Sequence, residues 1–414
     1  MTFKTPELLA PAGNFEKLKF AIYYGADAVY IGGSQFSLRA NAGNFTPDEV
    51  REGVGFAHQR GKRVYLAVNI FARNDDLPAL EEYLPIAARI GVDAFLISDP
   101  GVFSLAKKIA PQVPIHISTQ ANNVNWQTAS FWKQAGAKRI VLGRELSLLE
   151  AAEIGQKSGV ETELFVHGAI CISYSGRCLL SNFLTVRDAN QGDCSHPCRW
   201  KYRLQEEKRP GESFDVEEDN KGSYIMNSRD LSLMPLLPQL LAANLDAWKI
   251  EGRNKSAYYV ANITRIYRRA LDEWRELGPD FQVKAEWLKE LETVSHRDYT
   301  TGFAASHPDS DSYRYDDGGY IRNYDFAAII EGFKDGLLHA QQRNNFGVGD
   351  EIDLLIQNGE NLTFQIESLY DEQGVAISVA PHAKQRVLIK APQQINNQLA
   401  KLSYPLIVRR KVRV

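Results

Sequence analysis

The chain contains 414 residues, of which 44% are hydrophobic and 24% are charged, a balance typical of a folded globular protein and not of a disordered one. Its length exceeds that of one ordinary domain, so we expect a large domain with a smaller appendage. The formal net charge of -3 excludes a strongly basic surface overall, which leaves a local basic face as the electrostatic route to nucleic acid.

The amino-terminal sequence MTFKTPELLAPAG contains no apolar core and no cleavage site of a signal peptide. No run of the chain approaches the roughly 18 apolar residues that a membrane helix needs. We therefore expect a cytoplasmic protein without membrane contact. In such a reducing compartment, cysteines ligate metals more often than they form disulfides.

Eight strand-like runs, rich in β-branched and aromatic residues, alternate with amphipathic helical stretches. Four of these runs lie in the related phrases GADAVYI, GVDAFLI, GAKRIVL and NLDAWKI, each of which opens with the Gly or Asn that ends a helix. Eight strands at a spacing of roughly 30 residues predict an α/β fold, a TIM (β/α)8 barrel. The alternative is an open doubly wound sheet, which usually has fewer strands, and no GxGxxG follows the first run. The eight runs are Glu7–Ala10, Ala28–Ile31, Val64–Asn69, Ala94–Ser98, Ile115–Thr119, Arg139–Leu142, Glu161–Val166 and Ala247–Ile250.

The domain organisation follows from this strand count. The barrel is expected over residues 1–277, and it includes a cysteine-bearing insertion, 168–230, after the seventh strand. Its eighth helix is predicted over Ser256–Leu277. An irregular linker is expected over 278–323. Short strands and turns such as NNFGVGDE predict a small β-barrel domain over 324–414.

The four cysteines of the chain lie close together in the sequence. Cys171, Cys178, Cys194 and Cys198 have the spacing C-x6-C-x15-C-x3-C. Cysteines that serve as small buried hydrophobic residues would be scattered, so the pattern indicates metal ligation. Tetrathiolate zinc sites usually use two C-x2-C pairs, whereas an iron–sulfur cubane accepts looser spacing, so the spacing favours iron–sulfur and leaves zinc open. Cys171 directly follows the seventh strand, at the barrel end where TIM-barrel active sites lie.

Polar residues at the carboxyl ends of the other strands form the candidate substrate site. Arginine suits bidentate binding of a carboxylate, so these strand ends would suit a dicarboxylate ligand. His167 is either a proton donor or a hydrogen-bond partner of a cluster sulfur. The candidate substrate-binding residues are Arg39, Asn69, Gln120, Arg144 and Arg253, and the candidate catalytic residues are His167 and Glu251.

Two clusters of basic residues are candidates for RNA contact. The eighth helix carries Arg265, Arg268 and Arg269 among Tyr258, Tyr259 and Tyr267, and the chain ends with the basic run 409–413. Such clusters are usually solvated faces, but arginine and tyrosine together can also contact phosphates and stack on bases.

The run ELFVHGAICISYSGRCLLS, residues 163–181, resembles the signature of the collagenase-like peptidase family U32. The blocks LLAPAG (8–13), GADAVYIGG (25–33), ISTQ (117–120) and KIEGR (249–253) resemble the family's other motifs in the same order. The resemblance covers the barrel and extends to the tail, and it is greatest to members that act in tRNA hydroxylation.

This resemblance implies a [4Fe-4S] cluster on the four cysteines and an oxygen-independent hydroxylation. The implied reaction converts a tRNA wobble uridine to 5-hydroxyuridine, with prephenate as the hydroxyl source. Hydroxylation of rRNA or of a quinone precursor on the same scaffold is an alternative. Homo-oligomers, and hetero-oligomers with a family paralogue, stay open.

Peptidase activity is the competing hypothesis, and an RNA-binding module with an inert barrel is the third. The sequence contains neither the H-E-x-x-H of a metallopeptidase nor the G-x-S-x-G of a serine hydrolase. A cysteine peptidase needs a free thiolate, which ligation of all four cysteines would remove. A pure binding module leaves the cysteines at the barrel mouth without a role.

Overall fold

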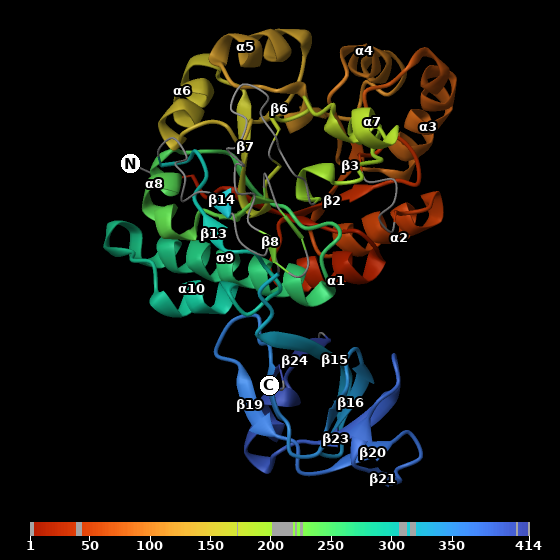
Figure 1. Cartoon of the computed structure of the whole chain (residues 1–414), viewed down its shortest axis with the longest axis vertical. Coiled ribbons are helices and arrows are strands. Elements are labelled where there is room, and N and C mark those ends of the chain that lie inside the picture. The colour runs from red at the N-terminus through yellow and green to blue at the C-terminus, as the bar shows by residue number, and fades with distance from the viewer. Residues whose placement is uncertain are drawn as a thin grey trace.

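The computed structural model describes residues 4–38, 44–171, 173–200, 218–219, 222–223, 227–305, 313–314, 320–402 and 405–412 (Figure 1). Part of the cysteine-bearing insertion therefore lies outside the described residues. Two bodies are visible in Figure 1: an α/β barrel with a ring of helices, and a smaller β domain that carries the carboxyl terminus.

Eight parallel strands form the barrel. Each strand pairs with the next, and the eighth pairs with both the first and the seventh, which closes the ring. The prediction of a TIM barrel over an open sheet is thus confirmed. The strands are β1 (Glu7–Pro11), β2 (Ala28–Gly32), β3 (Arg63–Val68), β4 (Ala94–Ile97), β5 (Ile115–Ile117), β6 (Arg139–Val141), β7 (Glu161–Ala169) and β12 (Ala247–Ile250).

Helices connect the strands and cover the outside of the barrel (Figure 1). Local signals fix where they begin and end: Thr46 and Ser147 each form a capping box with the Glu three residues on. Gly91 and Gly136 end their helices with φ of 93° and 103°, a conformation that favours glycine. The helices are α1 (Phe15–Tyr23), α2 (Pro47–His58), α3 (Leu77–Ile90), α4 (Pro100–Ile109), α5 (Trp126–Ala135), α6 (Leu148–Ser158), α8 (Leu237–Ala242) and α9 (Ala257–Leu277).

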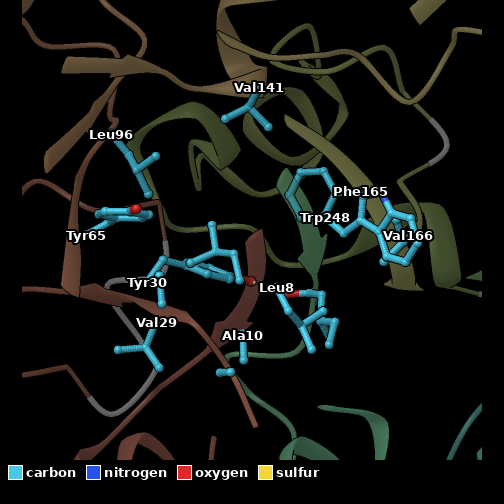
Figure 2. Close-up of a cluster of buried hydrophobic side chains, with 14 of the residues drawn as sticks. Leu8, Ala10, Val29, Tyr30, Tyr65, Leu96, Val141, Phe165, Val166 and Trp248 are labelled. Atoms are coloured by element: carbon cyan, nitrogen blue, oxygen red, sulfur yellow. Dashed lines mark hydrogen bonds between the residues drawn. The ribbon is translucent and has the colours of Figure 1, made fainter. Parts of the chain in front are cut away.

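The outward faces of the strands form an apolar core under these helices, in which Leu8, Val29 and Trp248 are fully buried (Figure 2). The inside of the barrel is more polar. Glu163 is fully buried there, and it forms ion pairs of 2.8 Å with Lys249 and 3.2 Å with Arg139. Buried charges are tolerated when they are paired, so this network holds the strands in register around the interior.

The sheet of the barrel continues beyond β7. The end of β7 pairs antiparallel with β11 (Asp230–Ser232), and β11 pairs with β13 (Tyr299–Thr300). Helix α10 (Ala285–Leu291) packs against α9. The expected irregular linker is therefore partly regular structure, and it packs on the barrel beside the cysteine-bearing loop.

The carboxyl-terminal domain is an antiparallel sheet of eight strands with its own apolar core. Among the described residues no pairing joins the outer strands β19 and β21, so the small β domain expected from the sequence is a half-barrel. In sheet order, the strands are β19 (Leu362–Gln365), β18 (Glu351–Leu354), β24 (Leu406–Lys411), β15 (Tyr324–Lys334), β16 (Leu337–Gln342), β23 (Arg386–Lys390), β20 (Leu369–Asp371) and β21 (Ala376–Ile377).

Polar contacts join this domain to α9 and α10. Arg409 of β24 donates hydrogen bonds of 2.7 and 3.0 Å to Glu290, and Arg265 bonds the backbone oxygen of Ile356 at 3.1 Å. Both arginines are almost fully buried. The prediction of RNA contact was therefore wrong for Arg265 and Arg409, because their charges stabilise the contact between the two domains. Arg413 lies outside the described residues.

None of the helices in the described ranges combines the length and the apolar character that crossing a bilayer requires.

Candidate functional site

A cavity of about 720 Å³ lies at the carboxyl ends of the barrel strands. Its walls come from strand ends, from the loops that follow them and from the cysteine-bearing segment after β7. This is the end of a TIM barrel at which catalytic residues converge.

All four cysteines line this cavity. Cys171 follows β7, Cys178 precedes α7 (Leu180–Thr185), and Cys194 and Cys198 lie further along the same segment. All four are thiols without a disulfide. No group of three or more His, Cys, Asp and Glu side chains in the described ranges already stands at metal-binding spacing. Four thiols that line one cavity nevertheless match the donor set of a tetrathiolate group.

The part of the cysteine-bearing segment that lies between Cys171 and Cys178 is held against the barrel loops. Glu145, after β6, accepts a hydrogen bond of 2.8 Å from the backbone N–H of Ser175. Gly176 has a φ of +75°, and a Cβ on this residue would lie 2.1 Å from the backbone oxygen of Gln120. The loop therefore fits the barrel through a close backbone contact that only glycine allows.

Replacement of Gly176 by Ala should displace this loop. The left-handed backbone costs about 1–2 kcal/mol for a residue with a Cβ, and the contact with Gln120 adds a clash. Gly61→Ala is a matched control, because Gly61 has a φ of +65° and open space around it. If the four cysteines hold an iron–sulfur cluster, Gly176→Ala should lower the iron content of the reconstituted protein and Gly61→Ala should leave it unchanged. Equal iron content in both variants would show that the loop contact has no such role.

Two of the predicted arginines line the cavity, and they differ in their contacts. The Arg144 guanidinium lies 3.8 Å from the centre of the Phe165 ring and makes no hydrogen bond or ion pair within the described part of the chain. Burial lowers the pKa of Arg144, although the negative charges of Glu251 and Cys171 act in the opposite direction and raise it. Arg253 donates hydrogen bonds to Asn44 and Ser37, at 2.8 and 3.3 Å, so it also holds the loop after β2.

Glu251 also lines the cavity and is 8% exposed. Its Oε2 lies 2.9 Å from the hydroxyl group of Tyr30, which donates the hydrogen bond. Lys249 lies beside them, with its ammonium 4.5 Å from the centre of the Tyr30 ring. Tyr30 and Lys249 were not predicted as site residues from the sequence. Both belong to recurring or family-like phrases, GADAVYI and KIEGR, so a signal for them was present.

The remaining predicted residues differ in whether they line the cavity. Asn69 and Gln120 line the cavity and are hydrogen-bonded to each other at 3.2 Å. Arg39 lies outside the described residues. The structure does not bring His167 into the cavity.

His167 is fully buried against aromatic rings on the outer side of β7. Its ring centre lies 5.0 Å from that of Tyr299, 5.7 Å from that of Tyr267 and 6.1 Å from that of Tyr259. Neither ring nitrogen has a hydrogen-bond partner within the described ranges. Burial lowers the pKa of His167 to about 3, so the imidazole is neutral at physiological pH. A neutral, enclosed ring of this kind packs as an aromatic side chain.

The lowered pKa of His167 should reduce the stability of the protein in acid. Below the unfolded-state pKa of about 6.5, the unfolded chain binds a proton that the folded chain excludes, so the free energy of unfolding falls by about 1.4 kcal/mol per pH unit down to pH 3. In His167→Phe this contribution is absent. Urea unfolding at pH 7 and pH 5 should show a smaller loss for the variant, by about 2 kcal/mol. His116 also has a lowered pKa, so both wild type and His167→Phe lose stability in acid through His116. The contribution of His167 is therefore the difference between the losses of the two proteins. Identical losses would contradict the buried neutral imidazole.

Comparison with known proteins places this site in a family. Residues 13–314 match the model of peptidase family U32, and residues 322–399 match that of the peptidase family U32 C-terminal domain. The tRNA hydroxylation protein P1 of Bacillus subtilis is 40% identical, covering 95% of this chain and 93% of that protein. The tRNA hydroxylation protein P of Escherichia coli is 37% identical, covering 98% and 96%. A 23S rRNA 5-hydroxycytidine synthase of Escherichia coli is 37% identical over 64% of this chain and 39% of that protein.

The family models together span both the barrel with its cysteine-lined mouth and the half-barrel domain, and the chain therefore belongs to peptidase family U32.

Proposed function

We propose that the protein is an RNA hydroxylase that acts on a wobble uridine of tRNA and forms 5-hydroxyuridine without molecular oxygen. Prephenate is the proposed source of the hydroxyl oxygen, and a [4Fe-4S] cluster the proposed cofactor. Replacement of the C5–H of uridine by C5–OH oxidises the base by two electrons, so prephenate would lose one oxygen atom and be reduced by two electrons. The names of the two relatives that match nearly the whole chain support tRNA as the substrate. The rRNA-modifying relative supports hydroxylation of a pyrimidine in RNA more generally.

One observation carries the proposal: the four cysteines and the Arg144 guanidinium line the same cavity. Four thiols are the donor set of a [4Fe-4S] cluster, which Cys171, Cys178, Cys194 and Cys198 would hold. When bound, such a cluster would supply reducing or Lewis-acid chemistry beside the bound substrate. A purely structural metal site would not need an anion-binding cavity next to it.

The residues of the chain itself then have distinct tasks. Arg144 brings a positive charge that no described group neutralises by a hydrogen bond or ion pair, so it is the proposed ligand for a carboxylate of prephenate. Arg253 lines the same cavity and contributes further positive charge while it holds the loop after β2. Glu251 is the proposed proton acceptor, because Tyr30 donates a hydrogen bond to Oε2 and keeps that oxygen in a fixed position.

An assay with purified components tests the proposal. The cluster-loaded protein is incubated without oxygen with prephenate and with tRNA from a strain that lacks the modification. Parallel reactions contain 23S rRNA, a quinone precursor, or gelatin and casein. We expect 5-hydroxyuridine in the tRNA digest, detected by mass spectrometry, and intact gelatin and casein. Proteolysis without any hydroxylated product would instead support peptidase activity.

A further inference from the structure

Three polar side chains on one wall of the cavity form a hydrogen-bonded chain whose direction is fixed by the backbone. The chain starts at the backbone N–H of Leu38, which donates to Oδ1 of Asn69 at 3.3 Å. A backbone N–H can only donate, so the oxygen of the Asn69 amide must face it. The Asn69 nitrogen therefore points the other way, where it lies 3.2 Å from Ser118 Oγ and 3.2 Å from Gln120 Oε1.

The orientation of the Gln120 amide is fixed in the same way, by the donors that face its oxygen. Its Oε1 accepts from Asn69 Nδ2 and also from the hydroxyl of Ser118, which is buried. Two donors converge on Oε1, so this atom cannot be exchanged with the amide nitrogen without placing N–H groups against N–H groups. The Gln120 amide nitrogen is on the opposite branch of the planar group. It donates to no described residue, and Gln120 lines the cavity.

We propose that the Gln120 amide N–H₂ is a substrate-binding donor that takes an sp² oxygen, either a carbonyl or a carboxylate, of the molecule held in the cavity. Asn69 and Ser118 are positioning residues that act through Gln120. This assignment rests on the proposed function for the identity of the two substrates. Because both amide hydrogens are donors, the subsite favours an oxo or carboxylate group and disfavours an amino group at the same place.

The position of Gln120 in the cavity supports its role as a substrate-binding donor. Its backbone oxygen lies close to Gly176 of the cysteine-bearing loop, and Gln120 lines the same cavity as the four cysteines, so an oxygen bound by the Gln120 amide lies in the cavity that the cysteines share. The oxygen can belong to the pyrimidine ring of the RNA or to prephenate. The chemistry is the same in both cases, and kinetics distinguish the two sources.

The test uses Gln120→Glu in the cluster-loaded protein. Glu keeps one oxygen for Asn69 and Ser118 and replaces the N–H₂ donor by a second oxygen of nearly the same size. The KM for tRNA is measured at saturating prephenate, and the KM for prephenate at saturating tRNA. We expect one of the two values to rise by about tenfold or more, which identifies the source of the oxygen, and the other to stay within about twofold.

The positioning role has its own pair of variants. Ser118→Ala removes a donor to Oε1 and should raise the same KM with little change in kcat. Ser118→Thr keeps the hydroxyl group and should restore it. Thermal unfolding of all variants identifies any that fail to fold. A KM that changes equally in Ser118→Ala and Ser118→Thr would overturn the positioning role.

Equilibrium binding separates this inference from the proposed function. Binding of prephenate is measured by calorimetry and binding of tRNA by filter retention, for wild type and Gln120→Glu. If wild type hydroxylates nothing but Gln120→Glu weakens one Kd tenfold, the donor role stands and the proposed reaction fails. If wild type is active and Gln120→Glu changes neither KM nor either Kd, the donor role is wrong.

Discussion

Replacement of Cys178 by Ala is expected to reduce bound iron from about four atoms per chain to well under half of that, and hydroxylation to background. Cys178 lines the cavity with the other three cysteines, and a cubane that loses one of four thiolate ligands is exposed to solvent and to loss of iron. Iron is measured by absorbance and elemental analysis after anaerobic purification. Hydroxylated uridine is measured in the same preparations.

Leu179→Ala is the matched control for this variant. Leu179 is adjacent to Cys178 in the sequence, is 73% exposed and carries no metal-binding group. We expect it to retain iron and activity. Stoichiometric zinc in the wild-type protein, without the brown colour of an iron–sulfur protein, would contradict the cluster. Full activity in Cys178→Ala would contradict the role of the cysteines in the reaction.

Replacement of Glu163 by Ala should destabilise the barrel by about 3–5 kcal/mol, because removal of one partner leaves buried charges uncompensated. Glu163 is fully buried and pairs with Lys249 and Arg139. Arg139 retains its ion pair of 2.7 Å with Glu7, so Lys249 bears most of the loss. The free energy of unfolding is measured by urea titration at neutral pH.

An exposed ion pair provides the control for Glu163. Glu153 and Lys157 form an i,i+4 pair on α6 with both side chains 51% exposed. Its removal by Glu153→Ala should cost less than about 1 kcal/mol. The double variant Glu163→Leu/Lys249→Met should be more stable than Glu163→Leu alone, because it removes both buried charges. A loss below about 1 kcal/mol in Glu163→Ala would show that water reaches the barrel interior.

The barrel could be predicted from the sequence because each of its signals is local. Runs of β-branched residues predict strands, and the Gly or Asn that opens each recurring phrase ends the preceding helix. Closure followed from the number of strands. Parallel strands also bring their carboxyl ends to one face, so the positions of Arg144, Glu251 and the four cysteines at one cavity were accessible from the sequence alone.

His167 could not be placed in this way because a β-bulge interrupts the alternation of side chains. Strand β12 pairs Lys249 with Phe165 but pairs the next residue, Ile250, with His167. The extra residue on β7 reverses which side chains face inward beyond it, so Phe165 lines the cavity while His167 faces the aromatic rings. A period of two, applied to the sequence, would place both residues on the same face.

The prediction of RNA contact by Arg265 and Arg409 was wrong for a different reason. Arg265 and Arg409 are separated by more than a hundred residues, and the carboxylate of Glu290 to which both donate comes from a third segment. Charge composition indicates that arginines are present, but it does not indicate which surface they meet. The contact between two domains is a property of the folded chain, and no local pattern encodes it.

Nucleoside analysis of cellular tRNA shows whether the protein hydroxylates tRNA in an iron–sulfur-dependent reaction. The gene and its close paralogues are deleted, and the strain is complemented with wild type or with Cys178→Ala. We expect 5-hydroxyuridine-derived nucleosides to disappear from tRNA on deletion, to return with the wild-type gene and to stay absent with Cys178→Ala. Unchanged tRNA nucleosides in the deletion strain, or full restoration by Cys178→Ala, would contradict it.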